Sequence, residues 1–85
     1  MNYIKQLNAV FQVFYCDQRL NNSHIGLYMA LFFYWNLHHF EKSFYANRKE
    51  LMVLSKIGSR STYHRLIQDL HNWGYLRYFP SKSPN

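Results

Sequence analysis

The segment SKIGSRSTYHRL, residues 55–66, determines how the whole chain is interpreted. Gly58 interrupts a pattern of helical spacing, and Ser59 after it is a residue type that caps helices. Apolar residues then recur with the period of an amphipathic helix at Tyr63, Leu66, Ile67, Leu70 and Trp73. Two short helices joined by a glycine-containing turn of about three or four residues form a helix-turn-helix. We therefore predict this motif, with its turn at residues 56–59 and its second helix ending near Trp73.

Polar side chains cover the rest of this second helix. They are Arg60, Ser61, Thr62, His64, Arg65 and Gln68. Such donors and acceptors contact base edges and phosphates, and in a helix-turn-helix the start of the second helix reads the major groove. The first acid, Asp69, comes later and is expected to lie away from a duplex. This face is the predicted contact with double-stranded DNA, although surface arginines are commonly only solvated. Ser59 is expected mainly to cap the helix and also to touch phosphate.

The first helix of the motif is predicted to follow Asn47 and to end at Gly58. Asn47 is its cap, and Glu50 at the third helical position suggests a capping box. Arg48 and Lys49 open this helix, where backbone amides favour a phosphate. Contact with DNA and simple solvation remain equal alternatives for these two residues.

The remaining segments predict two more helices and two short strands. One helix spans Asn2 to about Gln18, and the next runs from a cap at Asn22 or Ser23 to about His38. The second of these is apolar on almost every side, which indicates burial on several sides. The two aromatic N-terminal helices together are a candidate surface for a homodimer. The strands are predicted at residues 42–46 and 75–79. The expected fold class is mainly α with a small β ribbon.

Charge is distributed unevenly along the 85 residues, which carry a net charge of +6. Residues 1–46 contain three basic and two acidic side chains, whereas residues 47–85 contain seven and two. A basic half beside a nearly neutral half favours a polyanionic partner.

A single cysteine, Cys16, excludes an internal disulfide and suits a reducing compartment. No secretory signal is visible, and the longest apolar run, residues 27–35, is shorter than the ~20 residues of a membrane span. We expect a cytoplasmic protein without a membrane partner.

The stretch RKELMVLSKIGSRSTYHRLIQDLHNWGYL, residues 48–76, resembles the winged helix-turn-helix superfamily. The whole chain also looks like short regulators of bacterial mobile elements. The resemblance implies a recognition helix in the major groove, with contacts from Arg60, Thr62, His64 and Arg65. It also implies backbone contacts from a wing, with Arg77 on its first strand and Lys82 near its tip. Because the chain ends at Asn85, before a second wing strand, we expect a truncated wing in which residues 75–79 pair with 44–46.

These expectations combine into one domain over residues 1–85. It comprises an N-terminal helical pair (1–40), the helix-turn-helix (47–73) and a partial wing (75–85). The predicted function is sequence-specific binding of double-stranded DNA by a bacterial transcriptional regulator. Two alternatives stay open: a replication or excision accessory domain on the same fold, and a winged helix that binds protein and no DNA.

Catalytic, metal and cofactor sites are not expected. The chain has only four carboxylates, scattered along it, and no glycine-rich phosphate loop. Its histidines lack the spacing of zinc ligands, and the cysteine is isolated. No small-molecule site can be assigned from the sequence.

Overall fold

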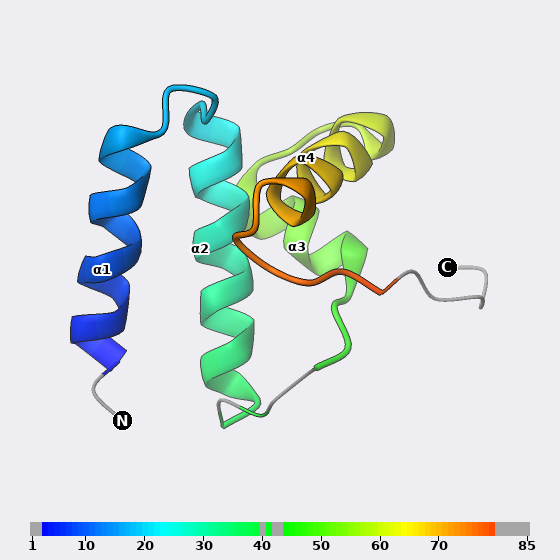
Figure 1. Cartoon of the computed structure of the whole chain (residues 1–85). Helices are drawn as coiled ribbons and strands as arrows, with labels where there is room; N and C mark the ends of the chain where they lie inside the picture. The colour runs from blue at the N-terminus through cyan, green and yellow to red at the C-terminus, as the bar shows by residue number, and fades with distance from the viewer. Residues whose placement is uncertain (1–2, 40, 42–43, 80–85) are drawn as a thin grey trace.

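The computed structural model describes residues 3–39, 41 and 44–79, which form four helices (Figure 1). These are α1 (Tyr3–Cys16), α2 (Asn22–Leu37), α3 (Arg48–Ser55) and α4 (Arg60–Asn72). Helices α1 and α2 form an antiparallel hairpin, and α3 and α4 lie on the opposite side of α2 from α1 (Figure 1). The predicted number and order of helices are confirmed. None of the helices in the described ranges is long and apolar enough to cross a membrane.

The predicted β ribbon is wrong, because no strand occurs among the described residues. The backbone N–H of Tyr75 donates to the carbonyl of Leu70 at 2.9 Å, and that of Tyr78 donates to Nδ1 of His71 at 3.1 Å. The end of α4 thus satisfies donors that a ladder would have used. Residues 44–46 are also irregular, and residues 42–43 lie outside the described ranges. The expected mainly-α fold with a β ribbon and truncated wing is therefore corrected to an all-helical fold.

Three helix boundaries differ from the predicted ones. Asn2 lies outside the described residues, and α1 ends at Cys16 instead of Gln18. The cap of α2 is Asn21, whose side chain accepts from the backbone N–H groups of Ser23 and His24. Neither Asn22 nor Ser23 is the cap, because both already belong to the first turn. The helix that was expected to reach His38 ends one residue earlier, with His38 at its C-cap.

The turn between α3 and α4 is built differently from the expected glycine turn. Lys56, with φ of 62°, takes the left-handed conformation that ends α3, and the N–H of Ile57 donates to the carbonyl of Met52 at 3.0 Å. Gly58 is not in a positive-φ conformation. Asn47 caps α3 by accepting from the N–H of Glu50 at 3.1 Å. The predicted cap of α3 is thus confirmed, but Glu50 completes no capping box, because its carboxylate accepts from the hydroxyl of Tyr34. Gly58 does not end α3.

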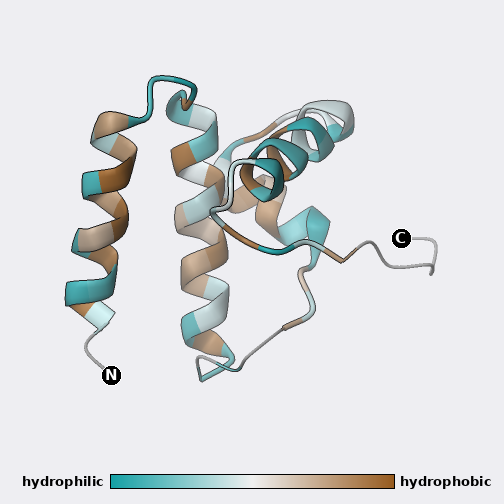
Figure 2. Cartoon of the chain, viewed as in Figure 1, coloured by the Kyte–Doolittle hydropathy of each residue, from teal (hydrophilic) through white to brown (hydrophobic). Residues whose placement is uncertain are grey.

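The core lies where α2, α3 and α4 meet. Leu27 of α2, Leu51 of α3, and Leu66 and Leu70 of α4 are completely buried. Ala30, Ile57, Tyr63 and Ile67 complete the same cluster. Figure 2 shows that α1 is also rich in hydrophobic residues, but only its Phe14 is buried. The inner face of α4 therefore packs against α2 and α3, and this packing determines which face of α4 points outward.

Candidate nucleic-acid interface

The outer face of α4 is polar and solvent-exposed. Its exposed predicted residues, which we call the reading face, are Arg60, Ser61, His64, Arg65 and Gln68. The opposite side of the helix is buried, including Tyr63, where burial raises the pKa of the phenol to about 12. The first turn of α4 contains no acidic residue. The five side chains lie on one side of a helix whose other side is fixed in the core.

Ser59 and Thr62 form the cap of α4. The Ser59 hydroxyl accepts from the backbone N–H of Thr62 at 3.0 Å and donates to the Thr62 hydroxyl at 2.9 Å. It also lies 3.2 Å from the Ser61 hydroxyl. The predicted cap is confirmed. Thr62 is half-buried and its hydroxyl belongs to this cap, so its position suits helix initiation better than contact with bases.

The other predicted DNA contacts lie outside α4. Arg48 and Lys49 form the first turn of α3, where Lys49 is exposed and Arg48 is half-buried. Arg77 is exposed in the irregular segment after α4, and so it does not lie on the predicted wing strand. Lys82 falls outside the described residues. The structure therefore places the exposed α4 residues together on one face.

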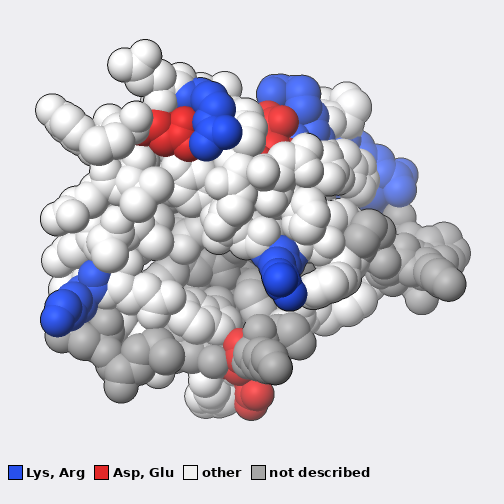
Figure 3. Space-filling view, viewed as in Figure 1, with Lys and Arg blue, Asp and Glu red and all other residues white. Residues whose placement is uncertain are grey.

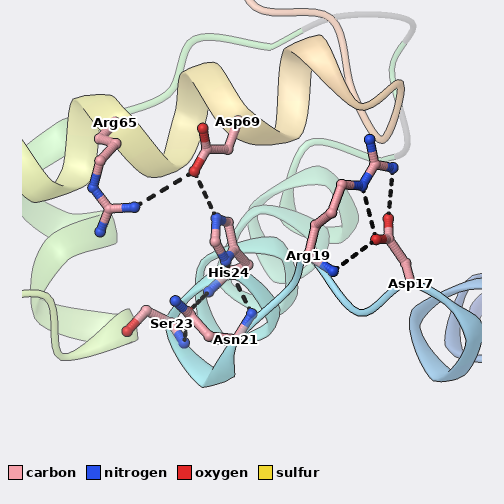
Figure 4. Close-up of polar contacts among 7 residues, drawn as sticks. All are labelled: Asp17, Arg19, Asn21, Ser23, His24, Arg65 and Asp69. Atoms are coloured by element: carbon pink, nitrogen blue, oxygen red, sulfur yellow. Dashed lines mark hydrogen bonds and ion pairs between the residues drawn. The ribbon is translucent and has the colours of Figure 1, made fainter.

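Asp69 lies beside the reading face, where it is half-buried next to Arg65. Its Oδ2 is 3.5 Å from Nη1 of Arg65 and 2.9 Å from Nε2 of His24 (Figure 4). His24 is a buried residue in the first turn of α2, with an exposed fraction of 2%. Its Nδ1 accepts the backbone N–H of Asn21 at 3.1 Å. Because Nδ1 accepts, the neutral ring bears its proton on Nε2 and donates it to Asp69.

Sequence reasoning missed the roles of His24 and Asp69. The Arg65–Asp69 pair was visible as an i,i+4 spacing on a helix. His24 occupies the third helical position after Asn21, where a side chain can return to the cap residue. The contact between His24 and Asp69, 45 positions apart in the chain, had no sequence signal.

A second polar cluster joins the α1–α2 loop to the segment after α4. Arg19 donates to Asp17 through Nε at 2.9 Å and Nη2 at 2.8 Å, and the Tyr75 hydroxyl donates to Asp17 at 2.7 Å. These bonds, foremost those from Arg19, hold the pKa of Asp17 well below its usual range. Burial, followed by the bond to Asp17, raises the pKa of Tyr75 to about 12. We call these three residues the Asp17 latch.

The latch borders a small open pocket and connects to His24 through an aromatic ring. The Arg19 guanidinium lies over Trp73 at 4.8 Å from the ring centroid, and Trp73 packs on His24 at 4.9 Å between centroids. The pocket has a volume of about 280 Å³. Its lining consists of Val10, Val13, Asp17, Arg19, Trp73, Gly74 and Tyr75.

Among the described residues, charged side chains are sparse on the face seen in Figure 3. Acidic residues at the upper edge of that view lie against basic ones, and most of the remaining described surface is uncharged. No group of three His, Cys, Asp or Glu side chains in the described ranges could hold a metal ion. Comparison with protein-family profiles, with curated proteins and with solved structures gives no match. The function of the chain is therefore inferred from its own geometry.

Proposed function

We propose that the chain binds double-stranded DNA sequence-specifically through the reading face of α4, as a bacterial transcriptional regulator. The observation that supports this most is the arrangement of α4 itself. Five exposed polar side chains, two of them arginines, occupy one side of a capped helix that has no acid in its first turn. A helix in the major groove needs such a surface of donors and acceptors.

The mechanism begins with electrostatic docking. The basic second half of the chain approaches the phosphates and releases counterions, so that log affinity falls with log salt by about 0.9 per phosphate neutralised. Helix α4 then enters the major groove, with Arg60 and Arg65 as the leading contacts. Because four apolar residues of α4 are buried, the helix enters as a rigid body supported by α2 and α3.

A salt titration of labelled duplex DNA tests this proposal. Arg60→Ala and Arg65→Ala should each weaken binding by about 1–3 kcal/mol, and their combination should weaken it further. Lys5→Ala on α1 removes the same charge away from the reading face and should change binding little. Binding without salt dependence, or a double variant that binds like wild type, would contradict the proposal. The same assay does not separate a regulator from a replication or excision accessory protein, which bind DNA alike.

A protein-binding module is the second candidate, and exposed apolar residues on and before α3 favour it. Val53 is 71% exposed, Leu54 is exposed next to it in sequence, and Tyr45 before α3 is 62% exposed. Exposed apolar surface of this kind often marks interaction sites. Absence of duplex binding at low salt would favour this candidate over the first.

The homodimer remains part of the proposal through α1. Ile4, Phe11 and Tyr15 are exposed, with Tyr15 at 91%, and their spacing of seven and four places them on one side of the helix. Dimeric helix-turn-helix proteins read two half-sites about one helical turn apart. Sedimentation equilibrium of wild type and Phe11→Ser should show a dimer that the substitution dissociates.

A further inference from the structure

Asp69 connects a buried histidine of α2 to an arginine of the reading face. One oxygen, Oδ2, contacts both Nε2 of His24 at 2.9 Å and Nη1 of Arg65 at 3.5 Å. Figure 4 shows the Arg65 guanidinium turned along α4 toward Asp69, while His24 reaches the same carboxylate from α2. Two helices that are distant in sequence therefore determine where this carboxylate lies.

We propose that Asp69, fixed by His24, is a positioning residue that holds the Arg65 guanidinium ready for base contact and so increases sequence discrimination. This inference rests on the proposed binding of DNA by α4. It assigns a role to a residue that does not itself need to touch DNA. It also explains why a carboxylate is present beside a surface proposed to meet phosphates.

His24 has almost no freedom to move. Its exposed fraction is 2%, and both ring nitrogens are hydrogen-bonded, Nδ1 to the N–H of Asn21 and Nε2 to Asp69. Its ring packs on Trp73, which in turn lies under the Arg19 guanidinium. A carboxylate bonded to such a fixed donor is itself restricted to one rotamer, because any other rotamer would leave the buried Nε2–H unsatisfied.

The contact with Asp69 restrains the Arg65 side chain but leaves part of its guanidinium available for DNA. The side chain is 58% exposed, and the contact to Asp69 uses Nη1. In the described part of the chain, Nε and Nη2 of Arg65 make no hydrogen bond or ion pair, and an arginine edge with two donors matches the O6 and N7 acceptors of guanine. Restricting the side chain before binding reduces the entropy that DNA binding would otherwise cost.

The negative charge of Asp69 also favours sequence discrimination. An unpaired arginine is attracted to any phosphate, and such contacts bind all sequences alike. Asp69 partly neutralises Arg65 and repels phosphates near it, so contacts that do not read bases become weaker. A simple i,i+4 surface pair would stabilise the helix slightly and would leave discrimination unchanged.

Asp69→Asn tests the role with little change in fold, since the Asn carbonyl still accepts from Nε2 of His24. The measured quantity is the ratio of affinities for a duplex that wild type selects from a random pool and for a scrambled duplex. We expect Asp69→Asn to bind the scrambled duplex more tightly and to lower the ratio about three- to tenfold. Glu50→Gln removes an equal charge from α3 and should leave the ratio unchanged.

A double-mutant cycle distinguishes positioning from a general charge effect. If Asp69 acts through Arg65, Asp69→Asn should no longer change the ratio once Arg65→Ala is present. A reduction of the same size in both backgrounds would overturn the proposal, although the DNA-binding function would stand. A wild type that selects no duplex would overturn both together.

Two substitutions of His24 separate its two hydrogen bonds. His24→Gln places a donor near the position of Nε2, whereas His24→Asn places an acceptor near the position of Nδ1 and lacks the donor to Asp69. We expect the Asn variant to lower the ratio and the Gln variant to retain more of it. NMR relaxation of the Arg65 Nε–H in the DNA-free protein supplies an independent measurement. An Arg65 that is equally mobile in wild type and Asp69→Asn would overturn the inference without involving DNA.

Discussion

Helices α1 and α4 are both amphipathic, yet the molecule uses their faces in opposite ways. Helix α4 buries Tyr63, Leu66, Ile67 and Leu70 and exposes polar side chains. Helix α1 buries only Phe14 and exposes large apolar side chains such as Tyr15. Amphipathic sequence therefore makes each helix form, but contact with α2 and α3 determines how firmly it is attached.

The attachments of the two helices differ in kind. Four buried side chains of α4 pack into the common core with Leu27 and Leu51. Helix α1 is attached through aromatic contacts: Tyr3 packs on Trp35 with ring centroids 6.2 Å apart, and near the C-terminal end Phe14 packs on Tyr28 and Tyr75 at 5.2 and 5.3 Å. The Asp17 latch begins at the next residue after α1. We therefore expect α4 to open only in global unfolding and α1 to open locally at lower free energy.

The largest effect is expected in the core under α4. Leu66→Ala removes a completely buried side chain from a small domain and should lower the free energy of unfolding by about 4 kcal/mol. His64→Ala, on the exposed side of the same helix, should change it by less than about 0.5 kcal/mol. Urea denaturation followed by circular dichroism measures both. Similar losses for the two variants would show that α4 is not fixed by its inner face.

A smaller and local effect is expected at α1. Phe14→Ala removes the single buried side chain of this helix in the described structure. It should lower the free energy of unfolding by at most about 3 kcal/mol, which is the lower end of the usual range for Phe→Ala. Tyr15→Ala, at the next position, removes an exposed aromatic side chain and serves as the matched control. Hydrogen exchange should accelerate in α1 for Phe14→Ala and stay slow in α2 and α4. Equal acceleration in all helices would contradict separate attachment.

The fold was predictable where local spacing and caps decide it. Asn47 and Ser59 are caps as expected, and Gly74, with φ of 84°, has the left-handed conformation that glycine commonly takes after a helix. The irregular structure of residues 75–79 was not predictable, because alternating aromatic residues are typical of strands. In the structure Tyr75 instead packs on Phe14 and bonds Asp17, 58 positions away. Such tertiary contacts override a local β preference.

The candidate interface was predictable only in part. Helical period and polarity identify the exposed positions of Arg60, His64 and Arg65. They do not reveal that the Thr62 hydroxyl joins the Ser59 cap, or that Asp69 meets buried His24. Both facts depend on side-chain geometry or on contact between distant helices, neither of which a single sequence encodes in its spacing.

The smallest predicted effect concerns the Asp17 latch and acid. Because the pKa of Asp17 is lowered in the folded state, mainly by Arg19, its stabilising contribution is complete above its unfolded pKa of about 4 and is lost as pH falls below it. Asp17→Asn should therefore be less stable than wild type at pH 7, and the two should converge toward pH 2. Urea denaturation at pH 7, 4 and 2.5 measures this difference. Glu41→Gln is the control, since the Glu41 backbone carbonyl, rather than its carboxylate, accepts the Trp35 indole N–H. A difference between wild type and Asp17→Asn that stays constant with pH would mean that Asp17 contributes by shape and not by its charge.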